Sequence, residues 1–229
     1  MAEEHGPEEV QQRYVTAMGQ DLGQLFHLLW NECAWLHLKW SDYMILFGNR
    51  PERVLLLNQA APTFFKLVQD AIWEDTLLHI CRLTDPPKSS GRDNLTLRRL
   101  LGLVPAEIRP DVDSLLQLAI LKSEFARDWR NRKIAHRDLR RALSESTIPL
   151  APASRKSVQE ALEAIVDVLN FVERHYDGST TRYDLCPPPG NAESLLCVLR
   201  DGVEAETARL RRLKSGNPSP EDIGPRPTI

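Results

Sequence analysis

The sequence lacks a long uninterrupted apolar run and a pair of cysteines spaced to hold zinc. Its most apolar stretches, residues 22–38 and 115–121, are interrupted by polar side chains before the roughly 20 apolar residues that span a bilayer. The four cysteines stand singly at positions 33, 81, 186 and 197. This argues against a zinc site and against a disulfide framework, and it favours buried free thiols.

An excess of charge of one sign is also missing, since 29 Lys and Arg face 32 Asp and Glu for a formal net charge of -3. Contact with nucleic acid would therefore need a local basic patch. The acidic, polar first nine residues are unlike a signal peptide, so we expect a cytoplasmic protein without a membrane segment. There is no glycine-rich phosphate loop, no GxSxG and no HExxH, which leaves nucleotide hydrolysis and metalloprotease chemistry without support.

Apolar residues recur at helical spacing over four stretches, residues 22–47, 55–83, 112–129 and 158–176. Pro62 can open the second helix and Ser154 can cap the fourth. Asn94 can cap a short helix through Leu101 that is followed by Gly102. No segment alternates with the period of a strand, so the pattern predicts an all-α fold, an antiparallel helical bundle with an extra C-terminal helix.

The composition divides the chain into four parts. We expect an N-terminal lead-in over residues 1–20, a helical bundle over 21–178, and an irregular segment plus a helix over 179–214. Residues 215–229 contain four prolines and almost no apolar side chains, which predicts a mobile tail.

A basic segment lies between Lys122 and Arg141, where eight Lys and Arg face three acidic residues. Such a patch is typical of a protein that binds a phosphate-bearing ligand. The alternative is a solvated helix face on which arginines pair with carboxylates. His136 adds an imidazole, which can move a proton at neutral pH, although it could also be a packed histidine that continues the apolar stripe of Phe125 and Trp129.

A histidine beside arginines can perform metal-free RNA cleavage. That reaction requires deprotonation of the ribose 2′-hydroxyl, stabilisation of charge on the phosphorus oxygens and protonation of the leaving 5′-oxygen. The run Trp129-Arg130-Asn131-Arg132-Lys133-Ile134-Ala135-His136-Arg137-Asp138 has five residues between its first arginine and its histidine. It resembles the Arg-polar-spacer-His signature of the HEPN superfamily, in the abortive-infection, AbiU-like branch. Residues 80–87 and 94–100 resemble that branch too, and the similarity covers roughly residues 21–175.

The resemblance implies a metal-independent endoribonuclease that needs no cofactor and acts on RNA as a toxin or phage-defence effector. Arg130 would contact the scissile phosphate, Asn131 would position the reacting groups, and His136 would transfer protons. Flanking phosphates would be bound by Arg132, Lys133 and Arg137. Support for the motif would come from Glu74 and Asp75. By analogy, a cognate antitoxin protein would restrain the activity.

The spacing of the motif raises a geometric question. Six residues of an ideal helix turn the chain by about 600 degrees, which leaves Arg130 and His136 about 120 degrees apart, whereas Arg132 and His136 share a face. Either the helix is distorted near Lys133 or a second subunit completes the site, and we favour a homodimer. Two alternatives stay open, a catalytically silent HEPN module that binds nucleic acid or a protein, and a plain helical interaction protein.

Overall fold

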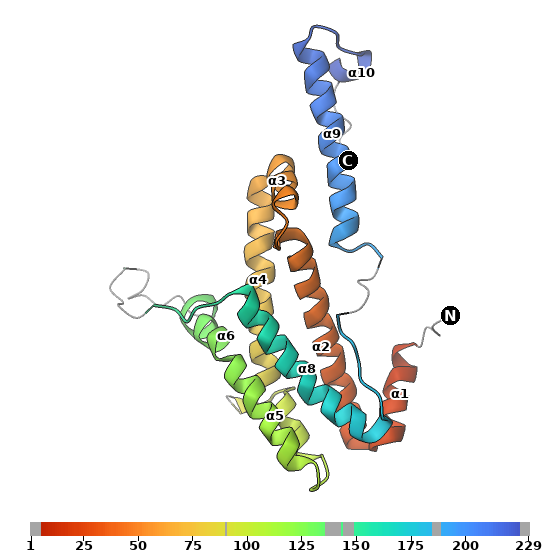
Figure 1. Ribbon diagram of the computed structural model, residues 1–229, viewed down its shortest axis with the longest axis vertical. Helices are drawn as coiled ribbons and strands as arrows, with labels where there is room; N and C mark the ends of the chain where they lie inside the picture. The colour runs from red at the N-terminus through yellow and green to blue at the C-terminus, as the bar shows by residue number, and fades with distance from the viewer. Residues whose placement is uncertain (1–5, 90, 136–142, 144–148, 185–188, 225–229) are drawn as a thin grey trace. The chain divides into compact units, whose positions relative to one another are not determined.

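The computed structural model describes residues 6–89, 91–135, 143, 149–184 and 189–224. Apart from one small hairpin, the regular elements of these residues are helical, which confirms the all-α prediction (Figure 1). The α-helices are α1 (Pro7–Met18), α2 (Gln20–Phe47), α3 (Pro51–Ala60), α4 (Pro62–Thr84), α5 (Arg109–Lys122), α6 (Glu124–Trp129), α8 (Arg155–Asp177), α9 (Ala192–Lys214) and α10 (Pro220–Ile223). The remaining elements are the antiparallel strands β1 (Lys88–Ser89) and β2 (Arg92–Asp93), the 3-10 helix η1 (Leu97–Gly102) and the π-helix η2 (Arg130–Ile134).

The chain forms two compact units. One contains Met1–Trp40 and Ile72–Leu185, and the other contains Ser41–Ala71 and Cys186–Ile229. The first unit holds the basic motif, so it is the one that matters for the candidate site. Among the described residues, none of the helices combines the length and apolar character needed to cross a membrane.

In the first unit, helix α8 packs against α5 and also contacts α1. Ser154 caps it, accepting a hydrogen bond from the Ser157 backbone N–H at 3.0 Å, and Gly178 ends it in the left-handed conformation at φ 65°. The apolar stripe of α8 is buried, as its spacing predicts, and consists of Val158, Leu162, Ile165, Leu169 and Val172. Val112, Leu116 and Ala119 are the buried residues of α5.

A buried carboxylate ties α1 to the end of α8. Glu173 is only 1% exposed, and it accepts hydrogen bonds from the Tyr14 hydroxyl at 2.9 Å and from Arg13 Nη2 at 3.2 Å. The Thr181 hydroxyl donates to the other carboxylate oxygen at 2.9 Å. Because two of these partners lie on α1 and the third follows α8, the carboxylate fixes the N-terminal helix, which the sequence did not indicate, onto the bundle.

Two of the predicted long helices are interrupted. The helix expected over residues 55–83 is divided at Ala61, and Pro62 opens α4 as predicted. The helix expected over residues 112–129 breaks at Ser123, whose buried hydroxyl donates to the Ala119 carbonyl at 2.7 Å. A serine that bonds back by four residues commonly bends a helix, which explains the change from α5 to α6.

The short helix expected from Asn94 is shifted. It is the 3-10 helix η1, and Thr96 caps it by accepting a hydrogen bond from the Arg98 N–H at 3.1 Å. Asn94 instead donates its side-chain amide to the Pro86 carbonyl at 2.9 Å. The predicted cap was wrong because Asn94 and Thr96 are both residue types that cap helices, and tertiary contacts set the turn at Pro86.

The second unit contains α9, which packs against α3. Asn191 caps α9, and Arg53 pairs with Glu193 at 2.7 Å. The composition of residues 215–229 did not indicate α10, where Asp222 is buried and pairs with Arg212 at 2.7 Å. The four-part division of the chain stays a prediction.

The cysteines differ from one another. Cys33 and Cys81 are buried free thiols, as predicted, but Cys197 is exposed on α9, so the expectation was wrong for that residue. Cys186 lies outside the described residues.

Candidate active site

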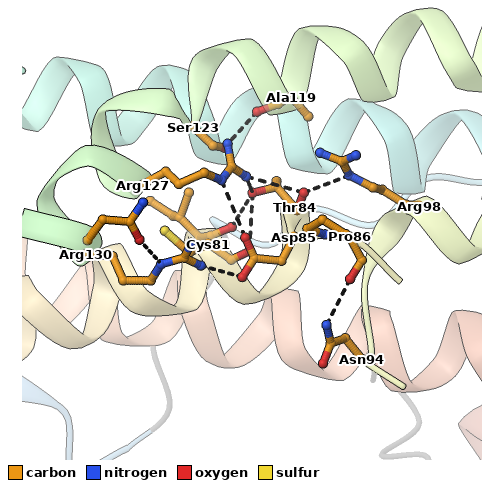
Figure 2. A network of polar contacts seen from close by, with 12 residues as sticks. Cys81, Thr84, Asp85, Pro86, Asn94, Arg98, Ala119, Ser123, Arg127 and Arg130 are labelled. Atoms are coloured by element: carbon orange, nitrogen blue, oxygen red, sulfur yellow. Dashed lines mark hydrogen bonds and ion pairs between the residues drawn. The ribbon is translucent and has the colours of Figure 1, made fainter. Parts of the chain in front are cut away.

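The candidate site forms where the C-terminal end of α4 meets the basic motif. Asp85, the first residue after α4, accepts an ion-paired hydrogen bond from Arg130 Nη1 through its Oδ2 atom. Arg127 Nε approaches the other carboxylate oxygen at 3.4 Å (Figure 2). Arg130 also donates from Nε to the side-chain oxygen of Asn131 at 3.0 Å. One carboxylate and one amide therefore fix the orientation of the Arg130 guanidinium.

Thr84 attaches Arg127 and a further arginine, Arg98, to the last turn of α4. Arg127 Nη2 donates to the Thr84 hydroxyl at 2.9 Å, and Arg98 Nε donates to the Thr84 carbonyl at 3.0 Å (Figure 2). The Thr84 hydroxyl itself donates to the Ile80 carbonyl at 2.9 Å. Arginine donors thus satisfy a carbonyl that the helix end leaves without an intrahelical partner, and they interact favourably with the negative end of the helix dipole.

The motif begins with a widened helical turn. The Ala135 N–H bonds to the Arg130 carbonyl at 2.8 Å, five residues back, which is the π-helical pattern. Such turns occur frequently at functional sites. The helix is therefore distorted around Lys133, one of the two explanations considered for the spacing of the motif. His136 and Arg137 lie outside the described residues, so their placement beside Arg130 stays a prediction.

Arg132 ties the motif to the segment that precedes α8. It pairs with Asp128 at 3.3 Å and donates to the Pro149 carbonyl at 3.0 Å. Asp128 in turn accepts the Ala151 backbone N–H at 2.8 Å, and Trp129 Nε1 donates to the Ala151 carbonyl at 2.9 Å. These contacts give Arg132 a structural part in holding the motif.

Lys133 is the more accessible of the two neighbouring cations. Its side chain is 45% exposed, its Nζ lies 4.6 Å from the centre of the Trp129 ring, and it is 3.5 Å from Glu74. Of the two carboxylates considered as support for the motif, Glu74 thus faces Lys133, whereas Asp75 pairs with Lys39 of α2. Their predicted part in supporting the motif stays a prediction.

Sequence reasoning missed Asp85. It is a single carboxylate placed just after a buried helix end and just before Pro86 and Pro87, so no periodic signal marks it. The available signal was its place in the segment 80–87 that resembles the HEPN abortive-infection branch. Asp85, Arg127 and Arg98 come from three separate parts of the sequence, which only the folded chain brings together.

The Arg130 guanidinium retains N–H donors that an anionic ligand could use. Its side chain is 24% exposed, and a guanidinium has five N–H donors, of which Nη1 and Nε make the bonds described above. A bidentate arrangement with a phosphate is therefore chemically accessible. Burial raises the pKa of the neighbouring Cys81 to about 11, with Arg130 opposing that shift, so this thiol is protonated at neutral pH and is a poor nucleophile. Among the described residues, no three or more His, Cys, Asp or Glu side chains are grouped to hold a metal ion.

The helical unit and its arginine-rich turn define a HEPN-type module. A family model described as AbiU2 (HEPN_AbiU2) matches residues 19–195, which is most of the chain. The chain therefore belongs to this family, a HEPN-type family of abortive infection. No curated protein and no solved structure gives a significant match to the chain.

Proposed function

We propose that the protein is a metal-independent endoribonuclease that cleaves RNA as a toxin or phage-defence effector in the cytoplasm. The observation that carries this proposal is the fixed guanidinium of Arg130. Asp85 and Asn131 hold it at a partly exposed surface, and it opens the arginine–histidine motif of a chain that belongs to the AbiU2 family. A preorganised cation of this kind suits a reaction in which negative charge builds up on phosphorus oxygens.

The proposed reaction is attack of the ribose 2′-oxygen on the adjacent phosphorus. The bond from phosphorus to the 2′-oxygen forms while the bond to the 5′-oxygen breaks, and the product is a 2′,3′-cyclic phosphate. Arg130 stabilises the charge on the non-bridging oxygens, and His136 carries the proton between the 2′-oxygen and the leaving 5′-oxygen. Asn131 acts through Arg130, because its side-chain oxygen accepts the Nε donor.

The flanking cations have unequal parts in this scheme. Lys133 can exchange its 3.5 Å contact with Glu74 for a phosphate because its side chain is 45% exposed. Arg132 is engaged by Asp128 and the Pro149 carbonyl, so its contribution to phosphate binding is smaller. Arg137 completes the set as proposed from the sequence.

We further propose a homodimer, in which the motifs of two subunits combine in one cleft. Pairing of two motifs across a dimer is what membership of a HEPN-type family suggests; the angle of about 120 degrees in a regular helix does not by itself require it, because Arg130–Ile134 form a π-helical turn. A cognate antitoxin protein would restrain the nuclease, by analogy with other toxins.

One observation favours the silent HEPN module as the second candidate. Each cation of the motif from Arg130 to Lys133 faces a carboxylate, namely Asp85, Asp128 or Glu74. Such pairing is also what a purely structural helix face would show.

Cleavage of a mixed RNA pool in EDTA tests the proposal, with circular dichroism as the check of folding. We expect Arg130→Ala and His136→Ala each to slow cleavage by about 10²-fold or more, as the loss of a charge-stabilising donor or of a proton-transfer group does. His175→Ala is the matched control, because His175 is exposed on α8. If folded wild-type protein binds RNA and leaves it intact, the silent module is the correct description.

A further inference from the structure

The segment that leads away from Asp85 is basic. Residues 86–99 contain four cations, Lys88, Arg92, Arg98 and Arg99, and one carboxylate, Asp93. The β1–β2 hairpin starts three residues after Asp85, a stretch that spans at most about 10 Å. The hairpin therefore lies close to the carboxylate that holds Arg130.

Two of these cations build the segment. Arg98 donates to the Thr84 carbonyl, and Arg99 donates to the Pro87 carbonyl at 3.0 Å and pairs with Asp93 at 2.7 Å. The side chains of Lys88 and Arg92 are exposed instead. Lys88 lies opposite Asp93 in the hairpin, where Arg99 and then Lys88 lower the pKa of the Asp93 carboxyl. Within the described part of the chain, Arg92 forms no ion pair with a carboxylate.

The hairpin contributes nothing to the apolar core. All four of its strand residues are exposed, and each strand has only two residues. Such a hairpin is not stable by itself, so the contacts of Arg99 and Asn94 with the Pro86–Pro87 turn keep it in place. The fold thus maintains a basic projection that begins three residues after Asp85 and that packing does not require.

We propose that Lys88 and Arg92 bind phosphates of the single-stranded RNA that reaches Arg130. This inference rests on the proposed function and names residues outside the motif that hold its substrate. A protein with a net charge of -3 needs a local cationic track to attract RNA. A single strand is the ligand because attack by the 2′-oxygen in line with the leaving oxygen requires a backbone that can leave the A-form geometry.

Binding of a short 2′-O-methyl oligonucleotide tests the inference without cleavage, because the methyl group blocks the attacking oxygen. Dissociation constants are measured by fluorescence anisotropy over a series of salt concentrations. In a plot of log K against the logarithm of the salt concentration, the slope for the Lys88→Ala/Arg92→Ala variant should be shallower than that of the wild type by about 1.4. Each lost phosphate contact on a single strand removes about 0.7 from the slope. The control carries Lys66→Ala and Lys156→Ala, whose side chains are 65% and 86% exposed.

The inference is overturned if the wild type binds the oligonucleotide and the Lys88→Ala/Arg92→Ala variant has the same slope. It is also overturned if the control variant changes the slope by the same amount. With cleavable RNA, the variant should raise KM and leave kcat near the wild-type value, because the lost contacts bind substrate and transition state alike. The two proposals fail separately. Wild-type protein that binds the oligonucleotide through these residues but leaves RNA intact in EDTA refutes the nuclease and keeps the binding track.

Discussion

Replacing Asp85 with asparagine should release Arg130 while preserving the shape of the side chain. The change removes the negative charge that pairs with Arg130 and with Arg127, whose side chains are 24% and 23% exposed. A hydrogen bond to a charged group contributes about 1.5–3 kcal/mol, and the Arg127 contact at 3.4 Å is too long to add much. The free energy of unfolding should therefore fall by about 2 kcal/mol.

The effect on activity should be larger than the effect on folding. A misplacement of about 1 Å in a reacting group can lower the rate about 10²-fold, and Asn131 alone cannot restore the fixed position of Arg130. We expect kcat for RNA cleavage to fall by about 10²-fold at a temperature where circular dichroism shows the variant folded. Urea titration gives the stability, and initial rates give the activity.

The control for this experiment is Asp70→Asn, the same chemical change on α4, where Asp70 is 56% exposed and pairs with Lys66. It should alter neither the rate nor, measurably, the stability, because exposed ion pairs contribute little. Asp85→Glu, which keeps the charge, should recover part of the activity lost in Asp85→Asn. Wild-type rate and wild-type stability in Asp85→Asn would refute the positioning of Arg130 by Asp85.

Two further predictions concern buried polar groups. Burial lowers the pKa of His37 to about 4, with Asp184 opposing, against about 6.5 in the unfolded chain. As the pH falls, the unfolded chain therefore binds the proton first, so stability that is present above pH 6.5 is lost toward pH 4. Urea titrations should show that the free energy of unfolding declines less steeply over this pH range in His37→Gln than in the wild type. An identical decline would contradict the assignment. Tyr14→Phe removes a donor at 2.9 Å from the buried Glu173 and should lower the free energy of unfolding by about 1–3 kcal/mol, whereas Tyr176→Phe should not. Equal losses in the two tyrosine variants would mean that the Tyr14 hydroxyl bond is not the cause.

The helices could be predicted because burial imposes a period on the sequence. In α8, the buried stripe, the Ser154 cap and the terminal Gly178 all indicate the same element. The break at Ser123 was missed because a hydroxyl that bonds back along its own helix leaves the apolar spacing unchanged. For α10, the stabilising contact between Asp222 and Arg212 joins a proline-rich segment to a neighbouring helix, which composition cannot indicate.

The candidate site was partly accessible from the sequence. Arg130 and Asn131 belong to a local motif. Its spacing left open a distorted helix or a second subunit, and although the sequence analysis favoured the second subunit, the π-helical turn at Arg130–Ile134 shows a distortion. Asp85 could not be found in this way because it lies 45 residues before Arg130 and acts through a contact between α4 and the motif. Local patterns identify residues with suitable chemistry, whereas the partners that fix them depend on the tertiary fold.

The central claim is most directly tested by offering the wild-type protein, in EDTA, one RNA and its fully 2′-deoxy counterpart, and by analysing the ends of the products. The account predicts that only the RNA is cut and that its upstream fragments end in a 2′,3′-cyclic phosphate, because the 2′-oxygen is the attacking atom. Cleavage of both strands, or products that carry a 5′-phosphate, would contradict it.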